Sequence, residues 1–197
     1  MDELKICFVS LDKNLPIYMD KYFANKNVSY KVQNILECDS ADIIVSPGNS
    51  FGQMDGGIDL MISKILSNKI GKIVRKKISE KYFGEQPIGT CIIIKTGNQK
   101  YPFLAHAPTM IIPKNVEGTL NAYYAFKAVL TSVINYNKRN SKKIHSILTT
   151  TFCTGCGDME LEKSLKQMRY AIEVVENGVG KDWDSANEHY LRLLDLQ

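Results

Sequence analysis

Two segments of the chain combine glycine with small polar residues, the residue types that can hold a phosphate. The first runs from Ser46 to Asp59, after the apolar run Ile43-Ile44-Val45 and before a segment of helical period. Its Gly56 and Gly57 would let the backbone approach a ligand closely, and the amino end of the next helix would offer unpaired N–H groups to an anion. Taken alone, this loop is explained equally well as a plain strand-to-helix turn.

A second segment of the same kind favours the anion site. It runs from Phe152 to Asp158, after Thr149-Thr150-Thr151 and before a helical pattern that starts near Leu161. Two loops that each leave a strand and enter a helix could flank one extended anion, such as a pyrophosphate.

Other residues with potential chemistry have simpler explanations. Cys153 and Cys156 form a C-x-x-C, but there is no second cysteine pair and the three histidines lack mutual ligand spacing, so we expect no metal and no cofactor. His106 ends an apolar run without a visible Ser or Cys nucleophile, and it stays unassigned. The sequence contains neither G-x-G-x-x-G nor G-x-x-x-x-G-K-[ST], which argues against an ordinary dinucleotide dehydrogenase and a P-loop NTPase.

The elements that would position these loops alternate along the chain. Short β-rich runs and longer segments of helical period predict an α/β fold, a sheet covered by helices on both faces. We expect strands at residues 5–9, 29–36, 42–46, 90–95, 103–107 and 145–150, and helices at 58–67, 72–82, 120–136, 161–175 and 185–194. The continuous apolar runs at 43–45 and 91–94 are typical of strands buried on both faces.

Length and charge limit the class of protein. With 197 residues, 44% of them hydrophobic, the chain can bury the core of one ordinary domain, and we expect a single domain over residues 1–197. The net charge of +4 favours an anionic ligand without the dense basic face of a dedicated nucleic-acid binder. The basic stretch from Lys69 to Lys77 is interpreted as the solvated outer face of a helix.

Cysteine usage and hydropathy indicate the compartment. Five cysteines, an odd number scattered along the chain, argue against a disulfide framework and indicate a reducing environment. The first apolar run, residues 6–9, is shorter than the roughly 7 to 15 residues of a signal peptide. No later run approaches the roughly 20 residues needed to cross a bilayer. We expect a cytoplasmic protein without membrane contact.

At these two loops the sequence resembles the macro domain family, and the resemblance covers most of the chain. The family's first loop commonly reads V-N-A-A-N-S and ends in a glycine run and V-D; residues 45–50 (VSPGNS) and 56–59 (GGID) stand in those places. Asn49 and Asp59 are ten residues apart, the interval expected in the family. The second loop, often S-T-G-x-aromatic-G, is matched by residues 153–157, one residue shorter and without the aromatic. The forms MDGGID and APTM are similar to a macro-like branch of bacteria and phages.

The resemblance implies a three-layer α/β/α sandwich around a mixed six-stranded sheet, with ADP-ribose across the carboxyl ends of the central strands. By resemblance, one side of the diphosphate is lined by Gly56, Gly57 and Ile58, and the other by Thr154, Gly155, Cys156 and Gly157. Asn49 would orient the distal ribose hydroxyls, and Asp59 would lie near the anomeric carbon or its water. Asn34, beside Ile35, stands where many members accept a hydrogen bond from adenine with an aspartate, so adenine preference would be weaker.

The implied activity is metal-independent hydrolysis at the distal ribose. Its substrate would be a mono-ADP-ribosyl protein, O-acetyl-ADP-ribose or ADP-ribose 1″-phosphate, and its partner ADP-ribose or an ADP-ribosylated protein. Two alternatives stay open: a non-catalytic ADP-ribose reader, and a phage-type structural or assembly protein that keeps only the fold. Asp55, in place of a family glycine, would repel a pyrophosphate unless its side chain points away.

Overall fold

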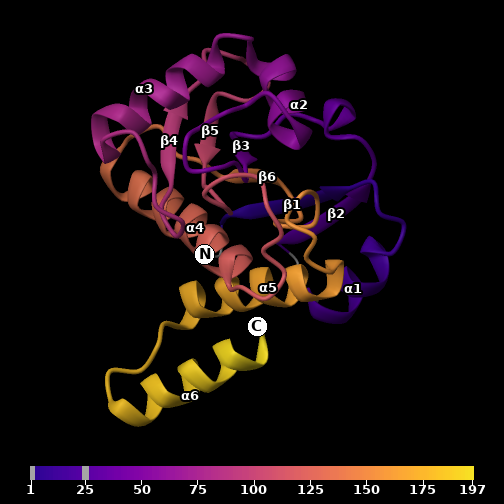
Figure 1. The fold of residues 1–197 in the computed structure, drawn as a ribbon, viewed down its shortest axis with the longest axis vertical. Helices are drawn as coiled ribbons and strands as arrows, with labels where there is room; N and C mark the ends of the chain where they lie inside the picture. Colours follow the sequence, from indigo (N-terminus) through magenta and orange to yellow (C-terminus); the bar gives the residue numbers. More distant parts are fainter. Residues whose placement is uncertain (1–2, 24–26) are drawn as a thin grey trace.

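A mixed sheet forms the centre of the computed structural model, which describes residues 3–23 and 27–197 (Figure 1). Within these residues the sheet has six strands in the order β2-β1-β6-β3-β5-β4. All neighbours are parallel except β4 and β5, which are antiparallel. The bounds are β1 Lys5–Ser10, β2 Val28–Val32, β3 Ile43–Ser46, β4 Ile92–Lys95, β5 Phe103–His106 and β6 Ser146–Thr150.

Burial follows each strand's place in the sheet. Every residue of β3 and β5 is buried, as expected for apolar strands covered by helices on both faces. The run at 91–94 departs from this expectation, because β4 is an edge strand and Ile93 is only half-buried.

Helices cover both faces of the sheet and make the three-layer sandwich (Figure 1). One face is covered by α2 and α3, whose buried residues Ile62, Val74 and Ile78 pack in one apolar cluster with Ile44 and Leu104. The other face is covered by α1, α4 and α5, and α6 packs on the outer side of α5. The bounds are α1 Leu15–Tyr22, α2 Gly57–Leu66, α3 Ile70–Tyr82, α4 Asn121–Arg139, α5 Leu161–Asn177 and α6 Trp183–Asp195. The α/β class and its mixed six-stranded sheet are therefore confirmed.

One local prediction was wrong, and one helix was missed. The strand expected at 29–36 ends at Val32, because Asn34 caps a 3₁₀ turn, Ile35–Glu37, by accepting a hydrogen bond from the Leu36 amide at 3.0 Å. The short helix α1 was not predicted. It has a proline in its first turn and buries only Leu15 and Met19, and two buried residues are too few for a clear helical repeat.

Two findings concern the chain as a whole. Cys7, Cys38, Cys91, Cys153 and Cys156 are free thiols. Over residues 3–23 and 27–197, no helix combines the length and the hydropathy that crossing a membrane requires.

Candidate functional site

Sheet topology brings the two predicted loops to one edge. β3 and β6 are parallel neighbours, with Ile43 opposite Ile147 and Ile44 opposite Leu148, so the loops that follow them leave the sheet side by side. The segment after β5 joins them. Met110 forms a parallel bridge with Asn49, and its Sδ lies 3.6 Å from Cys156 Sγ.

Asn49 uses its side chain to shape the first loop. Its Oδ1 accepts hydrogen bonds from the amides of Phe51 and Gln53, at 3.1 and 3.3 Å, and its Nδ2 donates to the Gln53 carbonyl at 3.0 Å. Its exposed fraction is 9%. The contacts therefore assign Asn49 to holding its own loop, while its predicted work on the distal ribose stays a prediction.

The end of the first loop is open to solvent at its glycines. α2 begins at Gly57, capped by Gly56, and a Cβ added to either residue would meet no atom within 4 Å. Ile58 is half-buried behind them. The amino end of α2 is thus accessible backbone, as an anion site requires.

The second loop is a tight turn with one exposed face. Cys153 and Asp158 have positive φ, 63° and 56°, and the Met159 amide closes the turn on the Cys153 carbonyl at 3.0 Å. Gly155 and Cys156 are exposed, and a Cβ on Gly155 would meet nothing within 4 Å. Thr154, in contrast, is half-buried, and its hydroxyl is 2.8 Å from the Thr151 hydroxyl.

Gly157 is the glycine of this turn that cannot be replaced without movement. It is buried, and an added Cβ would lie 2.5 Å from the Cys153 carbonyl oxygen. Its own carbonyl accepts from the Val116 amide at 2.8 Å. Gly157 therefore shapes the turn, and Gly155 is the better probe of a ligand.

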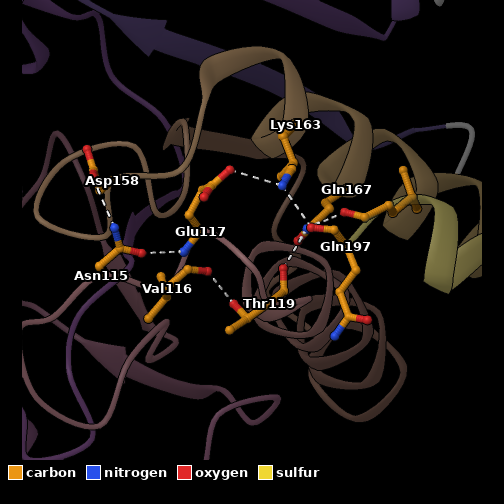
Figure 2. A network of polar contacts seen from close by, with 9 residues as sticks. Asn115, Val116, Glu117, Thr119, Asp158, Lys163, Gln167 and Gln197 are labelled. Atoms are coloured by element: carbon orange, nitrogen blue, oxygen red, sulfur yellow. Dashed lines mark hydrogen bonds and ion pairs between the residues drawn. The ribbon is translucent and has the colours of Figure 1, made fainter.

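A polar network braces the second loop from outside (Figure 2). Asn115 donates to the Asp158 carboxylate at 3.0 Å, and Lys163 pairs with Glu117 at 3.2 Å. Gln167 of α5 donates to the Thr119 carbonyl at 2.7 Å. The same two α5 side chains also reach the end of α6, since Lys163 donates to the Gln197 carbonyl oxygen and Gln167 to the Leu196 carbonyl, both at 2.8 Å.

Asn34 and Ile35 follow β2, farther along the same edge. β1 lies between β2 and β6, so these residues are separated from the second loop by one strand. Ile35 is 4% exposed and belongs to the apolar cluster beneath α2 and α3. The side-chain oxygen of Asn34 already holds the 3₁₀ turn, and its predicted contact with adenine stays a prediction.

Asp59 is directed inward, toward the end of β3. The residue is 6% exposed, and its Oδ1 accepts a hydrogen bond from the Ser46 hydroxyl at 2.6 Å. Burial raises the pKa of Asp59 from 3.8 to about 6; the bond from Ser46 acts against this rise and the nearby Asp55 carboxylate adds to it. Such a pKa suits a general base near neutral pH, but the carboxyl does not face open solvent.

His106, left unassigned from the sequence, completes a buried polar cluster with Asp59. The ring is 0% exposed, Nδ1 lies 2.8 Å from Gln86 Oε1, and burial lowers the pKa of His106 to about 4. Its Nε2 has no hydrogen-bond partner. A Cβ on Gly48 would lie 2.7 Å from this Nε2 and 2.8 Å from Asp59 Oδ2, so both atoms border one small space beside Gly48.

One sequence signal could have revealed this cluster. The first loop departs from the family pattern where Ser46 and Gly48 replace an asparagine and an alanine. Ser46 donates to Asp59, and Gly48 leaves the room that His106 needs. Gln86 gave no signal, because it lies in a loop after α3 and reaches His106 only through the tertiary fold.

The C-x-x-C pair belongs to the turn. Cys153 is buried, Cys156 is exposed, and burial raises the pKa of the Cys153 thiol to about 12, so this thiol is protonated near neutral pH. In the described part of the chain, no cluster of three or more His, Cys, Asp or Glu side chains is arranged to hold a metal ion.

Two surface cavities differ in volume and in position. One of about 160 Å³ lies beside the first loop, between Met54 and Asp55 on one side and Lys72 and Arg75 on the other. A larger one of about 420 Å³ lies near Leu4 and Ile144, before the amino ends of β1 and β6. Neither cavity is lined by a predicted site residue, and the smaller one is below the roughly 300 Å³ of usual ligand pockets.

Residues 16–182 match the model of a protein family described as Macro-like domain. The chain belongs to the Macro-like domain family. A protein of Aquifex aeolicus (strain VF5), described as uncharacterized, is 35% identical over 80 residues, which span 41% of this chain and 44% of that relative. α6 lies beyond the residues that the family model matches.

Solved macrodomains share the fold of this macro-like domain. The macrodomain of Mycobacterium tuberculosis DarG superposes with a TM-score of 0.61 at 18% identity, covering 74% of this chain and 90% of that one. The Oceanobacillus iheyensis macrodomain with ADP gives 0.58 at 18% identity, covering 79% and 85%. A point mutant of the same macrodomain with ADPR gives 0.59 at 14% identity, covering 83% and 91%.

His106 and Asp59 lie so close to Gly48 that adding one methyl group there should lower the stability of the fold. Gly48→Ala should destabilise the macro-like domain by about 1–3 kcal/mol, because the methyl displaces the tethered His106 ring or the Asp59 carboxyl. Urea unfolding measures the difference, with Gly155→Ala, whose Cβ enters open space, as the matched control. Equal stability of both variants would mean that the cluster is loosely packed.

The buried carboxyl predicts how stability depends on pH. Because the folded-state pKa of Asp59 is raised, its stabilising contribution is complete below pH 4 and is lost as pH rises through about 6. Asp59→Asn cannot ionise, so its free energy of unfolding should rise relative to that of the unmodified protein, by about 3 kcal/mol between pH 4 and 7. A constant difference over that range would refute the raised pKa of Asp59.

Proposed function

We propose that this macro-like domain binds ADP-ribose across the carboxyl ends of β3 and β6. One observation carries the proposal. Parallel pairing of these strands places the open glycines of two loops, Gly56 and Gly57 on one and Gly155 on the other, along the same edge of the sheet. Accessible backbone amides and the amino end of α2 then suit a diphosphate, which needs several N–H donors and no bulky side chains.

The ligands of related structures support the choice. The Oceanobacillus iheyensis macrodomain has been solved with ADP, and its point mutant with ADPR. Their fold is shared with this chain, whose two loops follow the parallel strands β3 and β6. The partner is ADP-ribose itself or a protein that carries it.

In the proposed pose the diphosphate lies between Gly56, Gly57 and Ile58 on one side and residues 154–157 on the other. The adenine extends toward Asn34, and the distal ribose toward Asn49 and Asp59. We further propose that residues 1–197 form one domain, with α6 covering α5, and that the protein works in the cytoplasm; free thiols at all five cysteines support a reducing compartment.

Calorimetry on the wild-type protein and one loop variant tests the binding proposal. The protein should bind ADP-ribose in one-to-one ratio, and Gly155→Glu should weaken binding by roughly two to four powers of ten, because two hydrogen bonds to a charged group are lost. Its melting temperature should barely change, since position 155 is exposed and open. No binding at millimolar ligand, or near-normal binding by the folded variant, would overturn the proposal.

Hydrolysis at the distal ribose is a second candidate, favoured by Asp59. A carboxylate with a pKa of about 6 is suited to take a proton from water near neutral pH. The substrates to incubate are mono-ADP-ribosylated protein, O-acetyl-ADP-ribose and ADP-ribose 1″-phosphate, with the products followed by mass. Asp59, in the first turn of α2, is the residue to replace, because it is the proposed base.

If Asp59 is the base, Asp59→Asn should lower turnover by about 10²–10⁴, the usual contribution of a general base, while ADP-ribose binding persists. EDTA should leave the rate unchanged. Unaltered turnover in Asp59→Asn would remove this residue from the mechanism. If none of the three substrates is hydrolysed, the non-catalytic ADP-ribose reader is the remaining function.

A further inference from the structure

The smaller cavity, of about 160 Å³, lies between the first loop, α2 and α3. Its lining consists of Gln53, Met54, Asp55, Ser63, Asn68, Gly71, Lys72 and Arg75. The volume is many times the roughly 10–15 Å³ that holds one water, and it is below the roughly 300 Å³ of a pocket for a drug-sized ligand. The cavity therefore suits a group of a few heavy atoms.

Two cations of α3 border this cavity, and no acid neutralises them. Among the residues that the structure describes, no carboxylate forms an ion pair within 4.0 Å of Lys72 or Arg75. On the outer face of the same helix, in contrast, Lys76 and Lys77 both pair with Glu80. The interpretation of this basic stretch as a solvated helix face therefore fits Lys76 and Lys77, whereas Lys72 and Arg75 belong to a concave surface.

Two contacts position the Arg75 guanidinium. Its Nη1 lies 3.5 Å from Gln53 Oε1, and 3.4 Å from the point that a Cβ on Gly71 would occupy. Gly71 is the second residue of α3, so its amide has no acceptor inside the helix. The absence of a side chain at position 71 thus leaves room beside an arginine and an open helix amide.

The donors at the cavity match the chemistry of a phosphate. Lysine and arginine side chains can only donate hydrogen bonds, and the amide of Asn68 adds another donor. Phosphate oxygens accept from several donors at once, two of them can bind the guanidinium fork, and the two charges of a phosphate balance Lys72 and Arg75. A carboxylate brings one charge and two oxygens, and would leave one cation unbalanced.

Asp55 borders the same cavity and opposes an anion there. Two cations outweigh this one carboxylate, so the local charge still favours an anion. The side chain that stands in place of a family glycine therefore lies beside Lys72 and Arg75, where it weakens the attraction of the pair for a phosphate. Its removal should strengthen binding.

We propose that this cavity binds one phosphate group through Lys72 and Arg75. The site does not depend on the proposed function, because it can be tested on protein without ADP-ribose. Two sources of the phosphate are distinguishable. It is carried on the distal ribose of ADP-ribose, since Asn49, assigned to that ribose, donates to the carbonyl of the lining residue Gln53 at 3.0 Å; or it belongs to a separate phosphate-bearing molecule.

NMR titration with inorganic phosphate, at constant ionic strength, tests the site. The amide signals of Gly71 and Lys72 should shift and saturate in the wild-type protein. Lys72→Gln and Arg75→Gln should each weaken binding about three- to tenfold, because one charged hydrogen-bond donor is lost at an exposed position. Asp55→Asn should strengthen binding about two- to fivefold.

Lys76→Gln is the matched control, since it removes the same charge from the same helix away from the cavity. It should bind phosphate like the wild-type protein, and acetate should shift the Gly71 and Lys72 signals far less than phosphate does. No shift with phosphate up to tens of millimolar, equal shifts with acetate, or equal weakening by Lys76→Gln would overturn the proposal. The same spectra show whether each variant is folded.

Calorimetry in the Asp59→Asn background, where turnover should be slow, separates the two sources. If the phosphate is carried on the distal ribose, ADP-ribose 1″-phosphate should bind more tightly than ADP-ribose, and Lys72→Gln should abolish this gain. Equal affinities, with the inorganic phosphate shifts unchanged when ADP-ribose is bound, would assign the cavity to a separate molecule. Failure of ADP-ribose to bind would refute the proposed function and leave the result of the phosphate titration standing.

Discussion

The parallel pairing around β3 is the constraint on which the site depends. β3 is buried on both faces and hydrogen-bonded to β6 on one side and β5 on the other, so the segments that follow all three strands must leave at one edge. The first loop, the second loop and the segment around Met110 therefore meet, although they are far apart in sequence. This edge collects backbone amides and a helix amino end without needing a cluster of charged side chains.

The same edge requires polar side chains to be buried. The first loop turns back over the end of β3, which encloses Ser46, Asp59 and His106 in a region that water does not reach. Burial raises the pKa of Asp59 and lowers that of His106, so each group favours its neutral form. The chain accommodates them by supplying Ser46 and Gln86 as partners and by keeping position 48 free of a side chain.

The second loop depends on parts of the chain outside the sheet. Its turn is tied to residues 115–119 and to α5, and two α5 side chains extend the network to the end of α6 (Figure 2). α6 lies beyond the residues matched by the family model, yet Lys163 and Gln167 bond both to it and to the segment that supports the second loop.

The sequence by itself determined the class of fold, the two loops and the edge at which they lie. Apolar periodicity is a direct result of burial, so five of the helices and the core of every strand could be located from it. The brief apolar repeat of α1 and the cap at Asn34 involve too few residues to be detected in this way. The Asn49 to Asp59 spacing likewise marked the first loop. Which way a side chain points was decided only by the tertiary structure. Asp59 accepts a hydrogen bond from Ser46, and Asn49 bonds its own loop. These contacts join residues brought together by loop closure, and no periodicity in the chain records them.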